Sequence, residues 1–315
     1  MIGGMNPERL SPGRPPLWAV HGLMLVAAIL VSTSFIVGEA ITRFLDPAVL
    51  TLVRFLLAVL LFAPCIAIRH GLTWPPRRAL VRYGAISASV VGFFWCMFAA
   101  LRFTTALNTS VLFTLVPGIS SLYGAVLLRE RLGWARLFAL FCGLVGSLWV
   151  IFRGDPAKLL ALDLNRGDLI FLAGCFLMGF YTPLVKLFHR GEPMAVMTFW
   201  VLVTGLGWLL PLAGPQLAAT AWAGVAPAVW AVVAYLAVFT TIVTFFLTQY
   251  STLHLGSTRV MAYSYFYPAL VLALDWLLGR GLPPLRTLPG VLVVVAAMFV
   301  LQRGANQQPE RPAIP

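Results

Sequence analysis

Charged and metal-binding residues are scarce in this sequence. Only 10% of its 315 residues are charged, whereas a soluble domain carries about 25%. There are four histidines, and the four cysteines lie inside apolar runs without forming a CxxC pair. This scarcity excludes an ordinary soluble domain, and it gives no basis for a disulfide framework, a metal site or a bound cofactor.

Signatures of catalysis and of nucleotide binding are also absent from the sequence. There is no GxxxxGK[ST] loop, so ATP is not the energy source. There is no HExxH pattern, paired carboxylate or activated nucleophile within or beside the apolar runs, which disfavours an integral-membrane enzyme or an interaction scaffold and predicts no catalytic residue. The net charge of +12 is dispersed between the apolar runs and forms no long basic block, so nucleic acid is not an expected partner.

Long apolar runs are what the sequence does contain. Hydrophobic residues make up 60% of it, and runs of about 20 residues, enough to cross a bilayer as a helix, recur from residue 18 to 302. The first run is too long for a signal-peptide core, so we interpret it as a retained span. The sequence predicts an all-α protein with the lipid bilayer as its partner and ten transmembrane helices, at residues 18–40, 47–68, 80–101, 105–127, 134–152, 168–188, 194–213, 227–249, 256–278 and 285–302.

The basic residues predict the orientation. If the N-terminus is cytoplasmic, 14 of the 22 Lys and Arg residues fall on the cytoplasmic side, Arg259 among them, 7 fall outside and Arg54 lies within a span. Cytoplasmic connections carry an excess of Lys and Arg. Both termini are therefore expected in the cytoplasm.

The two halves of the chain resemble each other. Aligning residues 102–133 with 253–283 brings Pro117 onto Pro268 and Leu127 onto Leu278. Each half holds five predicted spans, an odd number, so the second copy must be inverted in the membrane. Inverted repeats recur in secondary transporters, where the substrate site lies at the repeat interface. The predicted organisation is an N-terminal tail (1–17), a first repeat (18–152), a connecting loop (153–167), a second repeat (168–302) and a C-terminal tail (303–315).

Several stretches resemble a known family. The segments "LVRFLLA", "ALNTSVLFTLVPGISSLYGAVLLRERLG" and "GSTRVMAYSYFYPALVLALDWLLG", within ten predicted spans, are similar to EamA-type transporters of the drug/metabolite transporter superfamily. This resemblance covers residues 18–302. It implies export of a small metabolite, often an amino acid, across the bacterial cytoplasmic (inner) membrane by alternating access. It also implies a central cavity between helices one, three, four, six, eight and nine.

The stretch "VMAYSYFYPAL" (260–270) combines two features. Pro268 has a counterpart in Pro117, and a proline within a helix removes one hydrogen bond and kinks it, so the two prolines are expected to act as paired hinges. Tyr263, Phe266 and Tyr267 share one helical face and have no aromatic counterparts in the first half, where they align with Leu112, Leu115 and Val116. We predict that these three residues bind the substrate, with core packing as the alternative, and that Tyr265 on the other face has a packing role.

Polar and aromatic side chains at mid-depth on other predicted cavity helices complete the substrate-site prediction. Hydroxyls in such helices commonly bond to their own backbone, so the set matters more than any one member. The residues are Asn108, Trp95, Tyr181 and Thr244.

Charged residues inside spans are costly and are usually functional. Arg54 lies about 10 Å inside helix two at 1.5 Å per residue, and Glu39 and Asp275 lie at a similar depth on helices one and nine. We predict a gating or coupling role in which Arg54 pairs with one of the two carboxylates. Separate side chains that extend to the membrane surface are the alternative.

The sequence favours a secondary exporter of amino acids or similar small metabolites. The alternative is a proton-coupled efflux transporter for lipophilic cations, which in this superfamily uses a carboxylate in the middle of the first helix. Here that region reads "LMLVAAILVSTSF" (23–35) and has no acidic residue. Facilitated diffusion and proton coupling, and export and import, remain open. Gly143 and Ser147 have the spacing that lets helices approach closely, which predicts internal packing or a homodimer contact.

Overall fold

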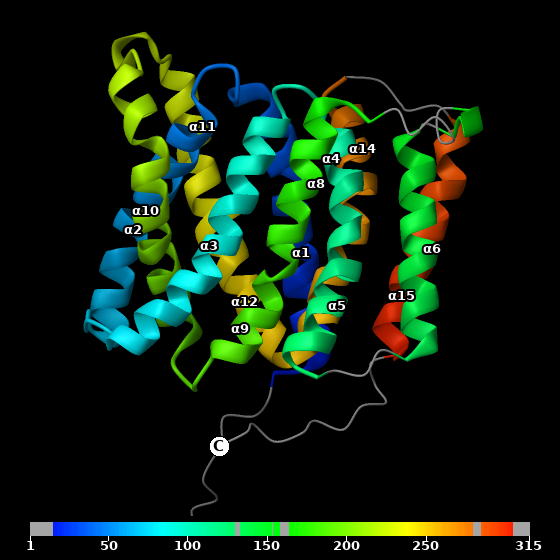
Figure 1. Cartoon of the computed structure of the whole chain (residues 1–315), viewed down its shortest axis with the longest axis horizontal. Helices are drawn as coiled ribbons and strands as arrows, with labels where there is room; N and C mark the ends of the chain where they lie inside the picture. Colours follow the sequence, from blue (N-terminus) through cyan, green and yellow to red (C-terminus); the bar gives the residue numbers. More distant parts are fainter. Residues whose placement is uncertain (1–14, 130–132, 153, 158–163, 280–284, 305–315) are drawn as a thin grey trace, which may run out of the picture.

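The computed structural model describes residues 15–129, 133–152, 154–157, 164–279 and 285–304, and within these ranges every regular element is helical (Figure 1). The first half contains α1 (Leu17–Ile41), α2 (Pro47–His70), α3 (Arg77–Ala100), α4 (Ala106–Leu112), the 3₁₀ segment η1 (Phe113–Leu115), α5 (Val116–Leu127) and α6 (Trp134–Ile151). Most of the tails predicted at 1–17 and 303–315, and residues 153 and 158–163 of the loop predicted at 153–167, lie outside these ranges.

The second half has more interruptions. It contains α8 (Arg166–Gly179), α9 (Tyr181–Phe188), α10 (Met194–Ala219), the 3₁₀ segment η2 (Trp222–Gly224), α11 (Pro227–Ala237), the π-helical segment η3 (Val238–Val243), α12 (Thr244–Leu255), α13 (Ser257–Ala262), the 3₁₀ segment η4 (Tyr263–Phe266), α14 (Tyr267–Leu277), the 3₁₀ segment η5 (Leu285–Thr287) and α15 (Leu288–Gly304).

Eight helical segments in the described ranges are long and apolar enough to cross a membrane. They are α1, α2, α3, α4 to α5, α8 to α9, α10, α11 to α12 and α13 to α14. Shorter apolar stretches lie in α6 and at the start of α15, at Leu137–Val150 and Leu285–Ala297. The structure thus confirms an all-helical protein with at least eight candidate spans, and the count of ten stays a prediction. The start of α1 and the end of α15 lie at the same end of the bundle (Figure 1).

Side chains cap several of these helices. Asp46 accepts a hydrogen bond from the Ala48 N–H at 2.9 Å at the start of α2, and Asn165 and Asp168 form a capping box at the start of α8. A cap satisfies N–H groups that the first helical turn leaves without partners. Such caps define where these spans begin.

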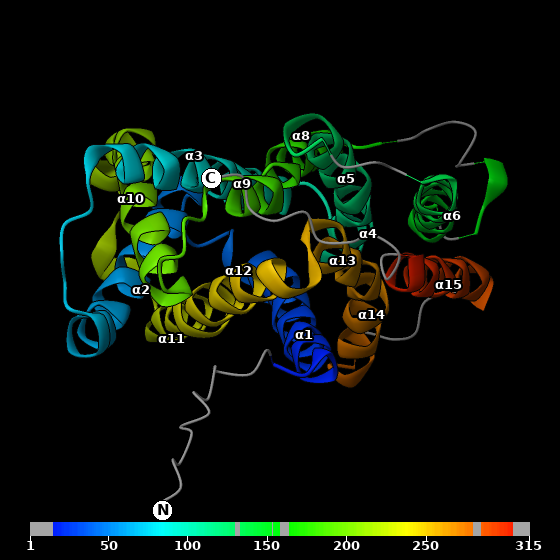
Figure 2. The same ribbon diagram turned by 90° about the horizontal axis from the view of Figure 1, so that it is seen from below.

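The helices α6 and α15 form a pair at one side of the bundle (Figures 1 and 2). They pack through glycine: a Cβ atom added to Gly146 would lie 2.8 Å from the carbonyl oxygen of Gly290. Ser147 donates a hydrogen bond to the Gly143 carbonyl at 2.6 Å and accepts one from Thr114. The small residues therefore serve packing within the chain, as predicted, and a homodimer stays a prediction.

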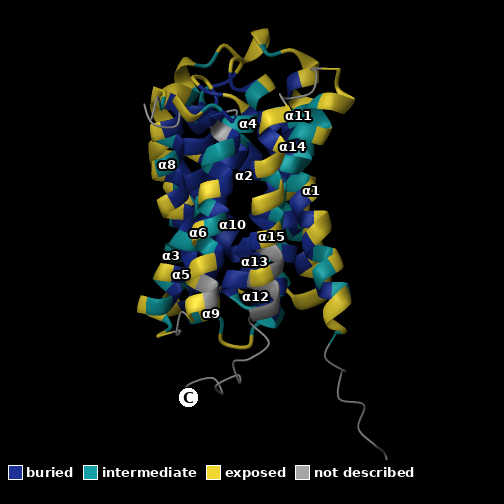
Figure 3. Cartoon of the chain, turned by 90° about the vertical axis from the view of Figure 1, so that its right-hand side faces the viewer, coloured by how far each residue is buried: buried dark blue, intermediate teal, exposed yellow. Residues whose placement is uncertain are grey.

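Buried residues fill the centre of the bundle, and exposed residues cover its outside (Figure 3). Among the described residues, three charged side chains are buried: Arg54, Asp168 and Arg259. Arg259 lies in the first turn of α13, within the span predicted at 256–278, and its place on the cytoplasmic side stays a prediction.

Replacing Gly146 by alanine is expected to destabilise the protein by about 1–3 kcal/mol, because the added methyl group forces α6 away from α15. The matched control is Gly207→Ala in α10, since a Cβ atom there meets nothing within 4 Å. Both changes improve helix propensity equally. Thermal unfolding in detergent should show a lower Tm for Gly146→Ala alone, and equal Tm values would contradict this packing role.

Candidate functional site

The two long helices that carry the paired prolines are both interrupted at mid-length. The 3₁₀ segment η1 comes directly before α5, and η4 comes directly before α14. Pro117 and Pro268 are each the second residue of the following α-helix, where the missing N–H costs least. Segments of 3₁₀ helix within a helix often mark hinges. η1 and η4 lie in contact, so the two interruptions meet inside the molecule.

An aromatic cluster surrounds this meeting point. We define it as Phe35 of α1, Phe93 of α3, Phe113 of η1, Phe171 of α8 and Tyr267 of α14, which are all buried. The ring of Tyr267 lies 5.2 Å from that of Phe113 and 6.0 Å from that of Phe35. Phe93 and Phe171 complete the contacts at 5.2 and 6.4 Å from Phe113. Five helical segments from both halves of the chain therefore converge on one set of rings.

The predicted tyrosine face does not act as a single unit. Tyr267 belongs to the aromatic cluster, whereas the Tyr263 hydroxyl lies 2.6 Å from Nδ1 of His21 near the start of α1. Phe266 contacts Tyr263, with ring centroids 6.2 Å apart. Sequence reasoning missed His21, although a histidine inside an apolar span is itself a signal.

Tyr265 packs in the opposite direction from its neighbours. A Cβ atom added to Gly143 would lie 2.7 Å from the Tyr265 ring, so this tyrosine fills the space that glycine leaves on α6. Its packing role was predicted from the helical face.

Arg54 is completely buried between α2, α3 and η3. Its Nε donates to Oγ1 of Thr241 at 2.5 Å, and its Nη2 donates to the carbonyl of Thr240 at 2.5 Å and to Oγ1 of Thr240 at 3.1 Å. The guanidinium carbon lies 4.1 Å from the ring centroid of Phe94. These partners are threonines, and not the carboxylate of Glu39 or Asp275 that the sequence predicted, because the π-helical turn directs two consecutive threonines toward α2.

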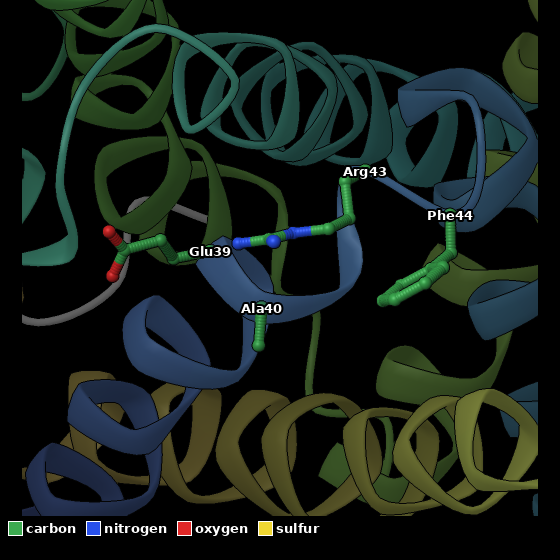
Figure 4. Close-up of a pocket in the computed structure, with 4 residues that line it drawn as sticks. All are labelled: Glu39, Ala40, Arg43 and Phe44. Carbon is green, nitrogen blue, oxygen red and sulfur yellow. The ribbon is translucent and has the colours of Figure 1, made fainter.

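Glu39 lies instead near the C-terminal end of α1, where it lines a pocket of about 420 Å³ with Ala40, Arg43 and Phe44 (Figure 4). Asp275 is half-buried in the last turns of α14. The predicted gating or coupling role of these two carboxylates stays a prediction.

The remaining predicted site residues lie in different surroundings. Tyr181 is buried, with its ring 5.9 Å from that of Phe245, and the Thr244 hydroxyl donates to the Thr240 carbonyl at 2.9 Å, next to Arg54. Asn108 is half-buried in the first turn of α4, where its N–H donates to Thr105. Trp95 is 37% exposed, outside the aromatic cluster.

We expect His21 and Tyr263 to be coupled energetically. A hydrogen bond of this kind contributes about 1 kcal/mol, so His21→Ala and Tyr263→Phe should each lower the stability. The double variant should lose less than the sum of the two single losses. Thermal unfolding of the four proteins in detergent measures this, and strictly additive losses would show that the two side chains do not interact.

Comparisons with known proteins agree with this architecture. The EamA-like transporter family model matches residues 18–152 and 165–302. An uncharacterised transporter, YyaM, of Bacillus subtilis is 19% identical over 89% of this chain and 92% of its own length. An uncharacterised transporter of Archaeoglobus fulgidus is 23% identical over 91% and 98%.

A third relative has a more specific name. The probable terminal-alkyne amino-acid exporter of Streptantibioticus cattleyicolor is 28% identical over 64% of this chain and 66% of its own length. One solved crystal structure has a TM-score of 0.69 with 18% identity, over 92% of this chain and 98% of its own, which shows a shared fold. The family model covers nearly the whole chain, and this protein therefore belongs to the EamA-like transporter family and is a multi-pass membrane transporter.

Proposed function

We propose that this protein is a secondary exporter of amino acids or closely related small metabolites in the bacterial cytoplasmic membrane. In this proposal ten spans form a five-plus-five inverted repeat, and both termini are cytoplasmic. The substrate crosses by alternating access through the centre of the bundle. The observation that carries the proposal is the convergence of η1 and η4 on the aromatic cluster.

Alternating access requires that the centre be closed from each side in turn. Toward one end of the bundle, α4 packs against α14 and α1, and toward the other end, α5 packs against α13 (Figures 1 and 2). At the α5 end, the hydroxyls of Ser120 and Thr182 lie 3.1 Å apart, and Ser121 bonds to Thr258 at 3.3 Å. Hydroxyl contacts of this kind contribute little net energy, so they suit a closure that forms and breaks in each cycle.

The chemistry of the interior favours a zwitterion with an apolar side chain. Aromatic rings offer apolar surface, and the hydroxyls of Tyr263, Tyr267 and Thr244 offer hydrogen bonds without net charge. The name of the Streptantibioticus cattleyicolor relative agrees with an amino-acid substrate. A lipophilic cation fits less well, because Arg54 puts a positive charge in the core and like charges repel.

Transport into proteoliposomes tests the proposal. The panel contains L-phenylalanine, L-leucine, a nucleobase and a lipophilic cation, each with and without a pH gradient. We expect the two amino acids to move. Movement of the cation alone would replace the proposal by multidrug efflux, and dependence on the pH gradient would identify proton coupling.

The two buried tyrosines Tyr267 and Tyr265 provide a matched test of the site. Tyr267→Leu and Tyr265→Leu remove the same buried ring and hydroxyl, so their stability losses should be similar. Only Tyr267 belongs to the aromatic cluster. Amino-acid transport per folded protein should therefore fall about tenfold or more for Tyr267→Leu and little for Tyr265→Leu. Equal losses would mean that the aromatic cluster does not contact substrate.

A further inference from the structure

The core of this transporter holds a cation whose hydrogen-bond partners are all neutral. Arg54 is 0% exposed, and it donates to one carbonyl oxygen and two hydroxyl oxygens of Thr240 and Thr241. A buried charge is costly unless it is paired, and a charge inside a membrane protein usually marks a substrate or ion pathway. Neutral oxygens satisfy N–H groups, but they leave the positive charge without a counter-charge.

One nitrogen of the guanidinium group has no hydrogen-bond partner. Nε donates to Thr241 and Nη2 donates to Thr240, whereas Nη1 is buried and makes no hydrogen bond. Each terminal nitrogen of arginine carries two N–H donors. Nη1 therefore offers charged N–H donors that have no acceptor, and a carboxylate suits them because hydrogen bonds between two charged groups are the strong ones.

The surroundings hold the guanidinium group in a fixed orientation. Thr240 and Thr241 belong to η3, and π-helical turns of this kind occur frequently at functional sites. The face of Phe94 lies 4.1 Å from the guanidinium carbon, and that of Phe98 lies 5.8 Å away. The phenylalanine rings fix the plane of the guanidinium group, and the threonines fix one edge of it. The group is therefore oriented before any ligand binds.

Arg54 is also connected to the aromatic cluster through Phe94. The ring of Phe94 lies 5.1 Å from that of Phe93, a member of the cluster, and 5.9 Å from that of Phe245. Phe245 in turn contacts Tyr181. The unpartnered donor therefore lies beside a continuous aromatic region, which suits a ligand that has a carboxylate at one end and an apolar group at the other.

We propose that Arg54 binds the carboxylate of the transported amino acid through Nη1, while Thr240 and Thr241 position the guanidinium group from the other edge. This role rests on the proposed export of amino acids and specifies its substrate class, since the ligand must carry a carboxylate. In this proposal Arg54 selects the substrate, whereas the sequence predicted a gating or coupling role for it.

The experiment compares L-phenylalanine with L-phenylalaninamide, which lacks the carboxylate, in proteoliposomes. Wild-type protein should transport the acid and discriminate against the amide. Arg54→Gln should lower transport of the acid about 10- to 100-fold, the loss expected for a hydrogen bond to a charged group, and should change transport of the amide little. Arg54→Lys keeps the charge but not the fork, so we expect an intermediate loss.

Two controls separate this role from a structural one. Arg82→Gln removes a charge from α3, where Arg82 bonds to the Phe188 carbonyl at 3.1 Å, and it should leave discrimination unchanged. The second test measures binding without transport, as the rise in Tm that L-phenylalanine causes. Arg54→Lys should reduce this rise, and Arg82→Gln should not.

The outcomes distinguish the two proposals. If wild-type protein moves no amino acid, the proposed function fails, and the role of Arg54 fails with it. If it moves acid and amide equally well, or if Arg54→Gln lowers both equally, amino-acid transport stands and Arg54 is only a structural link between α2 and η3.

Discussion

The structure depends on one constraint: a backbone polar group inside a membrane needs a partner within the protein, because the bilayer core offers none. Continuous helices meet this requirement automatically. Among the described residues, η1, η4 and η3 depart from the α-helical pattern inside the bundle. Around η3, the Thr240 carbonyl accepts hydrogen bonds from both Arg54 and the Thr244 hydroxyl. These departures lie in the interior, where such partners exist. Irregular backbone and polar side chains are therefore found in the same part of the bundle.

Burial of charge follows the same rule. Asp168 is buried at the start of α8, where it accepts hydrogen bonds from Thr104 and from the Asn165 N–H in a capping box. Arg54 is buried too, but its donors are only partly satisfied. The first arrangement stabilises a helix end and is complete. The second is incomplete, and an incomplete buried polar network is costly unless another state of the protein completes it. For Arg54, the state that we propose is the complex with the carboxylate of the substrate.

Sequence patterns predicted the helices well and the partners of individual side chains poorly. Apolar runs and a shared proline predicted the spans, the interruptions before Pro117 and Pro268, and the packing of Tyr265. The predicted end of helix eight at residue 249 was too early. In the structure α12 runs to Leu255, and Thr198 donates to the Gln249 side chain at 2.6 Å. The threonine partners of Arg54 depend on a π-helical turn that leaves no periodic signal in the residues.

The two halves therefore share their architecture more than their chemistry. Both contain a 3₁₀ segment followed by a proline, η1 before Pro117 and η4 before Pro268. By contrast, Val116 stands in the first half where Tyr267 stands in the second. The third helix of the first half, α3, is α-helical from Arg77 to Ala100, whereas the third of the second half contains η3. In the alternating access that we propose, both halves move, so a feature that they share suits that motion. A feature found in one half only is not needed for a motion that both halves share. Such a feature can therefore serve the recognition of one class of substrate without disturbing that motion.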